Sequence, residues 1–302
     1  NMWDKRNLSL FGKTLIIKSL ALSQLLYLVS VLPNPSLAIT KQIEKLIYKY
    51  LWNHKPDKVK RSYTSAPTKD GGLGIPHLVS QFLAIKCAWV KRLLSDMNAK
   101  WKYLVFKQLP CQDKFLWECN FHADDVKDIF YNMKSKFWYE VIKSWSNYNF
   151  KNPESVTEVI SQAIWFNSFI KIGKKTIFYR KWYDKGVRYI KDLLNRNRII
   201  MSYAEFTQKF NIQVDFVTYY GVICAIPTEW KDLIKTSTVY ISEKRKNIDC
   251  IMDTGKVPRF VYPELLNPHV GNFQLLVEKW KKELDCQVSL EELNTSFSLI
   301  YI

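Results

Sequence analysis

The spacing of apolar residues is the feature that most constrains how this chain can fold. From Leu37 to Trp52 they recur every three or four residues, whereas Lys41, Lys45 and Lys49 fall between them. That interval places apolar side chains on one face of an α-helix. The stripe expected to face inward consists of Ile39, Ile43, Leu46, Ile47, Tyr50 and Leu51. Only 9 glycines occur in 302 residues, which argues against a large sheet-and-loop enzyme fold and favours a mainly α-helical one.

The same periodicity predicts helices along most of the chain. The first runs from Leu8 to Leu32 and is stopped by Pro33 and Pro35, because proline cannot continue a helix. Others are expected from Leu78 to Ser95 and, as one long helix, from Asp124 to Tyr148. Between 236 and 270 the pattern is loose. The remaining expected helices span residues 183–195, 203–210, 214–235 and 272–285, with a weak one from 289 onward.

One short segment breaks the helical pattern. Apolar and polar residues alternate on both sides of Gly173-Lys174-Lys175, which predicts a small β-hairpin near residues 169–180. Residues 53–78 form a polar, basic connector rich in proline and glycine. We therefore expect a multi-helical bundle with this connector over residues 1–95, followed by a helical region with the hairpin over residues 96–302.

The stretch LIIKSLALSQLLYLVSVL, residues 15–32, is apolar and long enough to raise the question of a membrane span. It contains Lys18 and the polar residues Ser19, Ser23, Gln24 and Ser30, which favour a buried core helix and no membrane partner. The first residues, NMWDKRNLSL, show no signal-peptide pattern. The six cysteines include no C-x-x-C pair, so we expect reduced thiols and an intracellular location, cytoplasmic or nuclear.

Positive charge is concentrated in two blocks. Residues 1–110 carry 18 Lys/Arg against 5 Asp/Glu, and residues 169–200 carry 10 against 2. The intervening and following segments are close to neutral. Two separate basic blocks are typical of surfaces that meet a polyanion such as nucleic acid. The alternative is charge that only keeps the protein soluble, for which evenly scattered lysines would be expected.

The candidate nucleic-acid-binding residues lie in these blocks. In the connector, cations beside His54 and Tyr63 suit a segment that follows a phosphate backbone. In the second block, aromatic residues alternate with cations, so rings such as Trp182 could stack on bases. The alternative places these aromatic rings in the core, and for Trp182 we favour it. The candidates are Lys55, Lys58, Lys60, Arg61 and Lys69 in the first block, and Lys171, Lys174, Lys175, Arg180, Lys181, Lys185 and Arg188 in the second.

The sequence His122-Ala123-Asp124-Asp125 resembles the paired aspartates with which polymerases hold two metal ions. Such a pair needs apolar strand residues on both sides, whereas the residues that follow are spaced for a helix. We interpret Asp124 as the helix cap, with Asp125 and Asp128 near the positive end of the helix dipole. The glycine-rich GGLGIP lacks the Lys-Ser/Thr of a phosphate loop. We expect no catalytic residue, no metal site and no cofactor.

The order of several motifs resembles the region that follows the catalytic palm in LINE-type non-LTR retrotransposon reverse transcriptases. The pattern from Leu8 to Lys18, LSLFGKTLIIK, is similar to their helical thumb. Leu51-Trp52-Asn53 and the turn from Gly71 to Pro76 are similar to later thumb motifs. Segments such as AIWFNSFIKIGKKTIFYRKWYDKG and YAEFTQKFNI resemble the connector beyond the thumb. The resemblance covers nearly the whole chain and rests on the set of motifs together.

The resemblance implies that residues 1–95 are thumb-like and that 96–302 form the connector after the thumb. It implies binding of RNA and RNA–DNA duplex, with Lys13 and Lys18 facing the duplex backbone, and contact with the palm and fingers of the same polyprotein. The palm, the endonuclease and the carboxyl-terminal Cys/His cluster of such elements are absent from this sequence, so we expect no polymerase activity from this chain alone. A helical scaffold that binds protein is the competing hypothesis.

Overall fold

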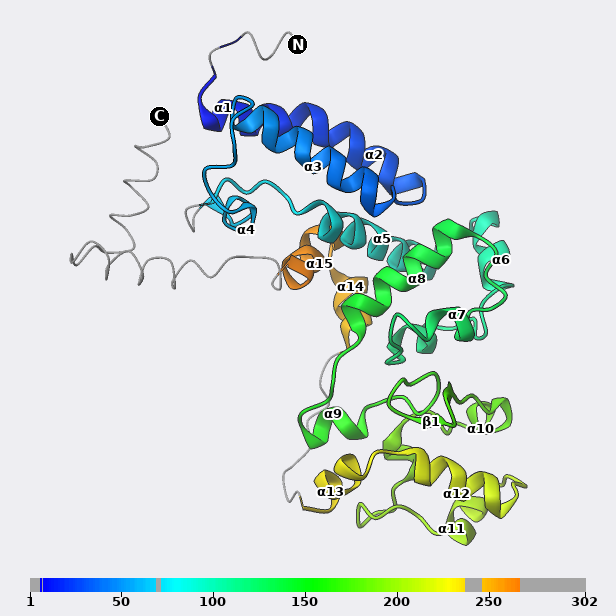
Figure 1. Cartoon of the computed structure of the whole chain (residues 1–302). Coiled ribbons are helices and arrows are strands. Elements are labelled where there is room, and N and C mark those ends of the chain that lie inside the picture. Colours follow the sequence, from blue (N-terminus) through cyan, green and yellow to red (C-terminus); the bar gives the residue numbers. More distant parts are fainter. Residues whose placement is uncertain (1–5, 7, 69–71, 237–245, 267–302) are drawn as a thin grey trace, which may run out of the picture. The chain divides into compact units, whose positions relative to one another are not determined.

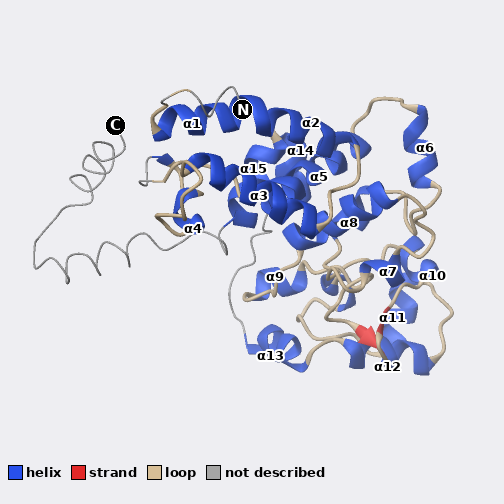
Figure 2. Ribbon diagram, turned by 45° about the horizontal axis from the view of Figure 1, so that its top comes forward, coloured by secondary structure: helices blue, strands red, loops and turns tan. Residues whose placement is uncertain are grey.

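A computed structural model describes residues 6, 8–68, 72–236 and 246–266 (Figure 1). They are mainly α-helical with one two-stranded antiparallel hairpin, which confirms the predicted fold class (Figure 2). They form two compact units. The first comprises the described parts of Asn1–Lys86 and of the segment that begins at Pro258, and the second is Cys87–Val257. This division falls inside helix α5 (Leu78–Leu94), whereas the boundary expected after residue 95 follows the end of that helix.

The first unit begins with the predicted long helix. It runs without interruption through α1 (Leu10–Ile16), a π-helical segment (Ile17–Leu22) and α2 (Ser23–Val31). Ser9 caps its start by accepting a hydrogen bond from the Gly12 amide at 3.2 Å. Its expected burial is correct for one face only, because Leu15 is 66% and Tyr27 70% exposed. Among the described residues, Leu10–Val31 is also the one helix long and apolar enough to cross a membrane.

Helix α3 (Leu37–Leu51) confirms the second predicted helix, with Ser36 as its cap. The inward stripe is narrower than expected, since Ile47 and Leu51 are buried whereas Leu46 is 66% exposed. The core of this unit joins the first helix, α3 and the start of α5. It consists of Ile17, Leu22, Val29, Ile47, Tyr48, Leu51, Trp52, Leu73, Ile75, Leu78 and Phe82.

The short helix α4 (Arg61–Thr64) and the glycine turn connect α3 to α5. A Cβ atom on Gly72 would lie 2.1 Å from the Ala66 carbonyl oxygen, and Gly74 has a φ of +59°. Both positions therefore require glycine, which agrees with the chain reversal expected there. Helix α15 (Val257–Leu266) is held by the Tyr262 hydroxyl, which accepts from the His77 amide at 3.0 Å.

In the second unit the predicted helix from Asp124 to Tyr148 is wrong as a single element. Two helices replace it, α7 (Val126–Ile129) and α8 (Lys136–Asn149). The chain leaves the helix at Phe130, whose buried ring packs edge-on against Phe121. The Lys134 amide then donates to the Gln108 side chain at 2.9 Å, so tertiary contacts overrule the local pattern. Earlier elements of the unit are α6 (Lys100–Phe106) and a 3-10 helix (Lys114–Glu118).

The hairpin prediction is confirmed by β1 (Lys171–Ile172) and β2 (Lys175–Thr176), joined through Gly173 at a φ of +66°. The helix expected at 203–210 is α11 (Tyr203–Phe210). The helix expected at 183–195 is wrong in extent, and the one expected at 214–235 is divided before Pro227. Their place is taken by α10 (Arg180–Asp184) and a 3-10 helix (Ile190–Leu193), and by α12 (Phe216–Ala225) and α13 (Thr228–Thr236).

Two further helices in the described part of the second unit are α9 (Val156–Ile160) and α14 (Asn247–Asp253). Helix α9 packs on α13, and β1 packs on α12. Both α14 and α15 lie in the stretch whose pattern is loose. The helices expected at 272–285 and from 289 onward lie outside the described residues. The unit's core is aromatic: the indole N–H of Trp145 donates to the Trp117 carbonyl at 3.1 Å, and that of Trp165 to the Val187 carbonyl at 2.7 Å.

Candidate nucleic-acid interface

Lys13 and Lys18 do not stand on an open surface. Lys13 is only 5% exposed, and its ammonium group donates to the Tyr50 carbonyl at 3.3 Å and to the Asn53 side chain. Lys18 is half-buried, donates to the Leu73 carbonyl at 2.8 Å, and has a pKa lowered by burial. Lys13 therefore points inward, which corrects the expectation that it faces the duplex backbone. Lys18 is bound to the glycine turn.

Other lysines of the first block also donate hydrogen bonds to backbone carbonyls, at the ends of helices. Lys86 is fully buried and donates to the carbonyls of Val29, at 2.7 Å, and Leu32, where α2 ends. Lys91 donates to two carbonyls at the end of α14, and Lys102 to the Ser95 carbonyl after α5. The last carbonyls of a helix lack partners within it and carry partial negative charge, so an ammonium group suits them. An isolated lysine in an apolar run, such as Lys86 in FLAIKCAWV, is the sequence signal for this role.

The connector does expose its cations. Asn53 and His54 have φ values of 52° and 61° and end α3. Lys55, Lys58 and Lys60 are then exposed, and their ammonium groups have no ion-pair partner in the described part of the chain. Arg61 is exposed but engaged, because its Nε lies 2.8 Å from Asp57 and its guanidinium 4.4 Å from the centre of the Tyr48 ring. Lys69 lies outside the described residues.

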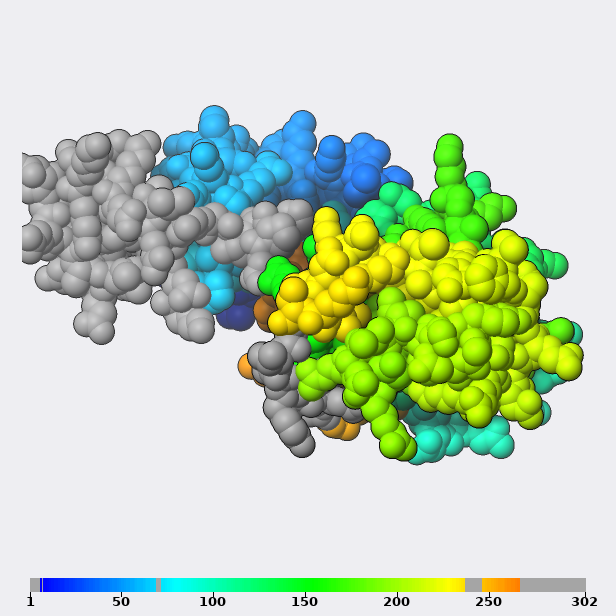
Figure 3. Space-filling model, turned by 90° about the horizontal axis from the view of Figure 1, so that it is seen from below, coloured from blue at the N-terminus to red at the C-terminus, as the bar shows by residue number. Residues whose placement is uncertain are grey.

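The second block gathers cations on the hairpin and on α10. Lys174, Lys175, Lys181 and Lys185, which we call the hairpin cluster, are exposed, and none forms an ion pair with another described residue. In the space-filling view, the yellow-green and yellow segments that follow α9 make a continuous face of the second unit (Figure 3). A phosphate backbone that meets this cluster would find charge that no carboxylate of the described residues neutralises.

Three other candidates of this block have partners within the chain. Lys171 forms an ion pair with Asp125 at 2.7 Å, and Arg180 pairs with Asp184 at 3.1 Å. The guanidinium of Arg188 lies 4.6 Å from the centre of the Tyr183 ring. Arg180 is exposed and its pair is open to solvent, so it remains available to a ligand, whereas Lys171 is held by a mostly buried carboxylate.

The aromatic residues interleaved with these cations belong to the core. Trp182 is 2% exposed and packs on Phe206 at 4.7 Å and on Trp165 at 5.9 Å between ring centres. Tyr183 is 5% exposed. This confirms the core interpretation of Trp182. These two rings are therefore not placed to stack on bases.

The prediction that Asp124 caps the helix is wrong, whereas Asp128 lies in the first turn of α7, near the positive end of the helix dipole, as expected. Asp124 is 89% exposed and faces His122, with 3.2 Å between Nδ1 and a carboxylate oxygen. Asp125 precedes α7, but its carboxylate makes no cap hydrogen bond and instead accepts from Ser168 and Lys171. The two side chains thus serve different neighbours. Within the described ranges, no group of three His, Cys, Asp or Glu side chains is arranged to hold a metal ion.

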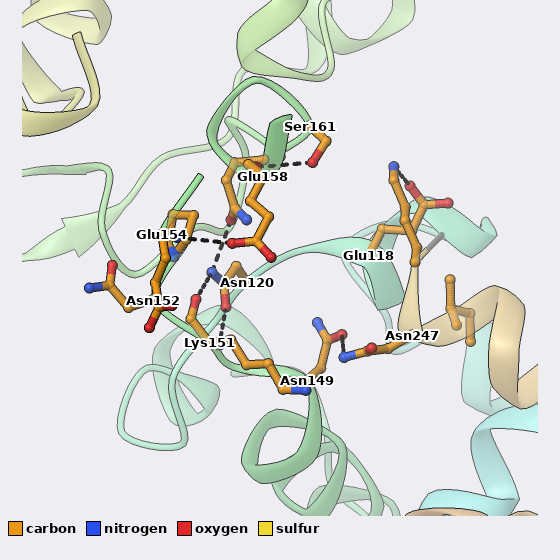
Figure 4. Close-up of a pocket in the computed structure, with 13 residues that line it drawn as sticks. Glu118, Asn120, Asn149, Lys151, Asn152, Glu154, Glu158, Ser161 and Asn247 are labelled. Atoms are coloured by element: carbon orange, nitrogen blue, oxygen red, sulfur yellow. Dashed lines mark hydrogen bonds and ion pairs between the residues drawn. The ribbon is translucent and has the colours of Figure 1, made fainter. Parts of the chain in front are cut away.

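A polar cavity of about 510 Å³ lies in the second unit and was not foreseen from the sequence (Figure 4). Its walls carry Glu118, Glu154 and Glu158 together with several amides. Most of these groups bond to the chain itself: Asn120 donates to the Lys151 carbonyl at 2.7 Å, and Glu158 accepts from the Glu154 amide at 2.9 Å. With three carboxylates on its walls, the cavity is not suited to phosphate.

On the wall of this cavity, Glu118 accepts hydrogen bonds from Lys246 and from the Tyr189 hydroxyl, the latter at 2.5 Å. Burial raises the pKa of Tyr189, and the bond to the Glu118 carboxylate raises it further. The buried thiols of Cys87 and Cys119 also have raised pKa values because burial disfavours the thiolate. These groups are therefore protonated at neutral pH and are not nucleophiles. No protein-family model matches the chain.

Proposed function

We propose that this chain is the nucleic-acid-binding thumb and connector part of a LINE-type reverse transcriptase, which grips RNA and RNA–DNA duplex and performs no chemistry by itself. The observation that carries the proposal is the hairpin cluster. Four exposed lysines without a carboxylate partner among the described residues occur in a stretch with 10 Lys/Arg against 2 Asp/Glu. The order of motifs along the chain supports the same class of protein. The palm and fingers of the polyprotein would be its further partner.

The connector lysines, Lys55, Lys58 and Lys60, extend the proposed grip. They are exposed like the hairpin cluster, and they lie in a segment with little secondary structure apart from α4. Contacts of this kind touch the phosphate backbone and carry no sequence information. We therefore expect affinity for RNA or RNA–DNA duplex that falls steeply with salt and depends little on sequence.

The test is the salt dependence of binding, measured on the full chain with a structured RNA. Replacing the four lysines of the hairpin cluster by glutamine should make the plot of log affinity against log salt less steep, by up to roughly 2.8–3.6, at about 0.7–0.9 for each lost phosphate contact. The matched control replaces the exposed lysines Lys127, Lys143, Lys235 and Lys256, which removes the same charge outside both blocks. The proposal is wrong if both variants change the slope equally, or if neither changes it.

A protein-binding scaffold is the second candidate, and one observation favours it. The first unit has an apolar groove of about 550 Å³ between the first helix and α3, with Leu20 and Leu46 on its walls. Their exposed fractions are 44% and 66%. Exposed apolar surface of this kind is typical of a protein interface. Binding there would depend weakly on salt, so the same titration separates the two functions.

A further inference from the structure

Four aromatic rings meet at the surface of the second unit, and the function proposed above does not use them. This surface aromatic cluster joins Trp89 of α5, Trp101 of α6, and Phe137 and Trp138 of α8. Trp101 and Trp138 are stacked, with ring centres 5.6 Å apart and an angle of 20° between the planes. Trp89 meets both edge-on, at 5.8 and 5.9 Å, and meets Phe137 at 5.1 Å.

The partial exposure of the cluster separates it from the other tryptophans of this unit. Trp117, Trp145 and Trp165 are 0% exposed and Trp182 is 2% exposed. Every ring of the surface aromatic cluster, in contrast, keeps part of its area open to solvent. The buried indoles form the core that holds the unit together. The surface aromatic cluster thus brings three partly exposed indoles together, and adjoining apolar area that remains open to solvent is a feature of binding sites.

An arginine lies over a ring of this cluster, and three lysines stand close to the other rings in the sequence. The Arg92 guanidinium lies 4.7 Å from the centre of the Trp89 ring. Lys100 precedes Trp101 in the chain, and Lys134 and Lys136 flank the start of α8, just before Phe137 and Trp138. All four of these cations are exposed. The acidic residues nearest in sequence are Asp96, which is exposed, and the half-buried Glu140. The exposed residues that flank the rings in the sequence therefore carry net positive charge.

We propose that the surface aromatic cluster stacks the unpaired bases of a single-stranded nucleic acid, while the surrounding cations hold its phosphates. Every base has an aromatic face, so rings set among Arg and Lys side chains bind single strands with little sequence preference. This inference rests on the proposed nucleic-acid function and adds a second, chemically different subsite to it. The hairpin cluster meets phosphates, whereas the surface aromatic cluster distinguishes an unpaired strand from a duplex.

The test compares two ligands of equal charge on the full chain: a short uridine strand and an abasic strand of the same length. Both present the same phosphates, but only the first offers bases to stack. We expect the uridine strand to bind about tenfold or more tightly, the gain that stacking of one or more bases brings. Trp101→Leu should remove most of this preference and leave the salt slope unchanged. Trp138→Phe, which keeps a ring, should retain most of it.

Phe260→Leu is the matched control, because it removes an aromatic ring that is 40% exposed on α15 of the first unit. It should leave the preference for bases intact. Melting temperatures identify any variant that fails to fold, and the comparison of the two strands on the unaltered chain needs no variant. Equal binding of both strands would overturn the inference while the salt slope still supports the proposed function. Binding to anionic phospholipid vesicles that Trp101→Leu abolishes, without preference between the strands, would assign the cluster to a membrane surface instead.

Discussion

The two basic blocks use the same residue types for different purposes. In residues 1–110, Lys13 and Lys86 are buried and donate to backbone carbonyls at helix ends. In residues 169–200, the lysines of the hairpin cluster are exposed and have no ion-pair partner among the described residues. The first block has the larger net charge, +13 against +8. Net charge in the sequence thus overstates the charge that the first block presents to a ligand.

The difference follows from the surroundings of each lysine. Lys86 lies on the buried face of α5, and an ammonium group there must find carbonyls, because an unpaired buried charge is costly. Lys174 lies at the turn of a two-stranded hairpin, where water satisfies it at no cost. Only the second kind of lysine is free to exchange small counterions for phosphates. Within the first block, the connector lysines are of this second kind.

The largest effect we predict concerns the inward side of the second block. Trp182→Ala should lower the free energy of unfolding by roughly 3–5 kcal/mol, because it leaves a cavity among Trp165, Phe206 and Tyr219. Chemical denaturation of the two chains measures this. A variant of unchanged stability that loses RNA affinity would contradict the comparison, since Trp182 would then belong to the binding surface like the lysines beside it.

Sequence periodicity predicted the elements whose ends are set locally. Helix α11 begins with a capping box, in which the Ser202 side chain accepts from the Glu205 amide and the Glu205 side chain accepts from the Ser202 amide. Its predicted bounds are correct. The helix from Asp124 failed because the fold turns the chain at Phe130 through contacts with residues distant in sequence. Helix α14 escaped detection for a similar reason: Lys91, far along the chain, satisfies its last carbonyls. The spacing of apolar residues within a segment does not indicate partners that are distant in the sequence.

The residues of the candidate site also fall into those that the sequence could locate and those that it could not. The sequence located the exposed cations of the connector and hairpin, since charge in a turn or loop is normally exposed. It could not separate Lys13 from these, because the partner side chain, Asn53, becomes a neighbour only after α3 folds back. Nor could it join Trp89, Trp101 and Trp138, which come from three helices. Their spacing along the chain gives no periodic signal.

The second prediction makes the same substitution in both blocks. Lys86→Ala should cost about 3 kcal/mol of stability, because it removes a buried side chain and leaves the Val29 and Leu32 carbonyls without their donor. Lys174→Ala should change stability by less than about 0.5 kcal/mol, as is usual at exposed positions. Urea denaturation measures both.

RNA binding should respond in the opposite order. Lys174→Ala should make the salt dependence of binding less steep by about 0.7–0.9, the value of one phosphate contact. Lys86→Ala should leave this slope unchanged in the folded fraction. The contrast between buried and exposed lysines is wrong if the two variants lose equal stability. It is also wrong if Lys86→Ala alone weakens binding.

The smallest effect concerns Lys171 of the hairpin. A carboxylate binds its ammonium group, just as backbone carbonyls bind those of the buried lysines. Asp125→Asn should release its ammonium group while the new amide keeps a bond to Ser168. The stability loss should be about 1 kcal/mol, since the Asp125 side chain is only 14% exposed but its partner Lys171, at 31%, can be solvated when released. The freed cation should then steepen the salt slope of RNA binding by about 0.7–0.9. Asp124→Asn is the matched control, because it removes the same charge at the neighbouring position. The Asp124 side chain is 89% exposed and pairs with His122, not with Lys171. If both variants steepen the slope equally, net charge alone governs binding, and the distinction between held and free lysines has no bearing on it.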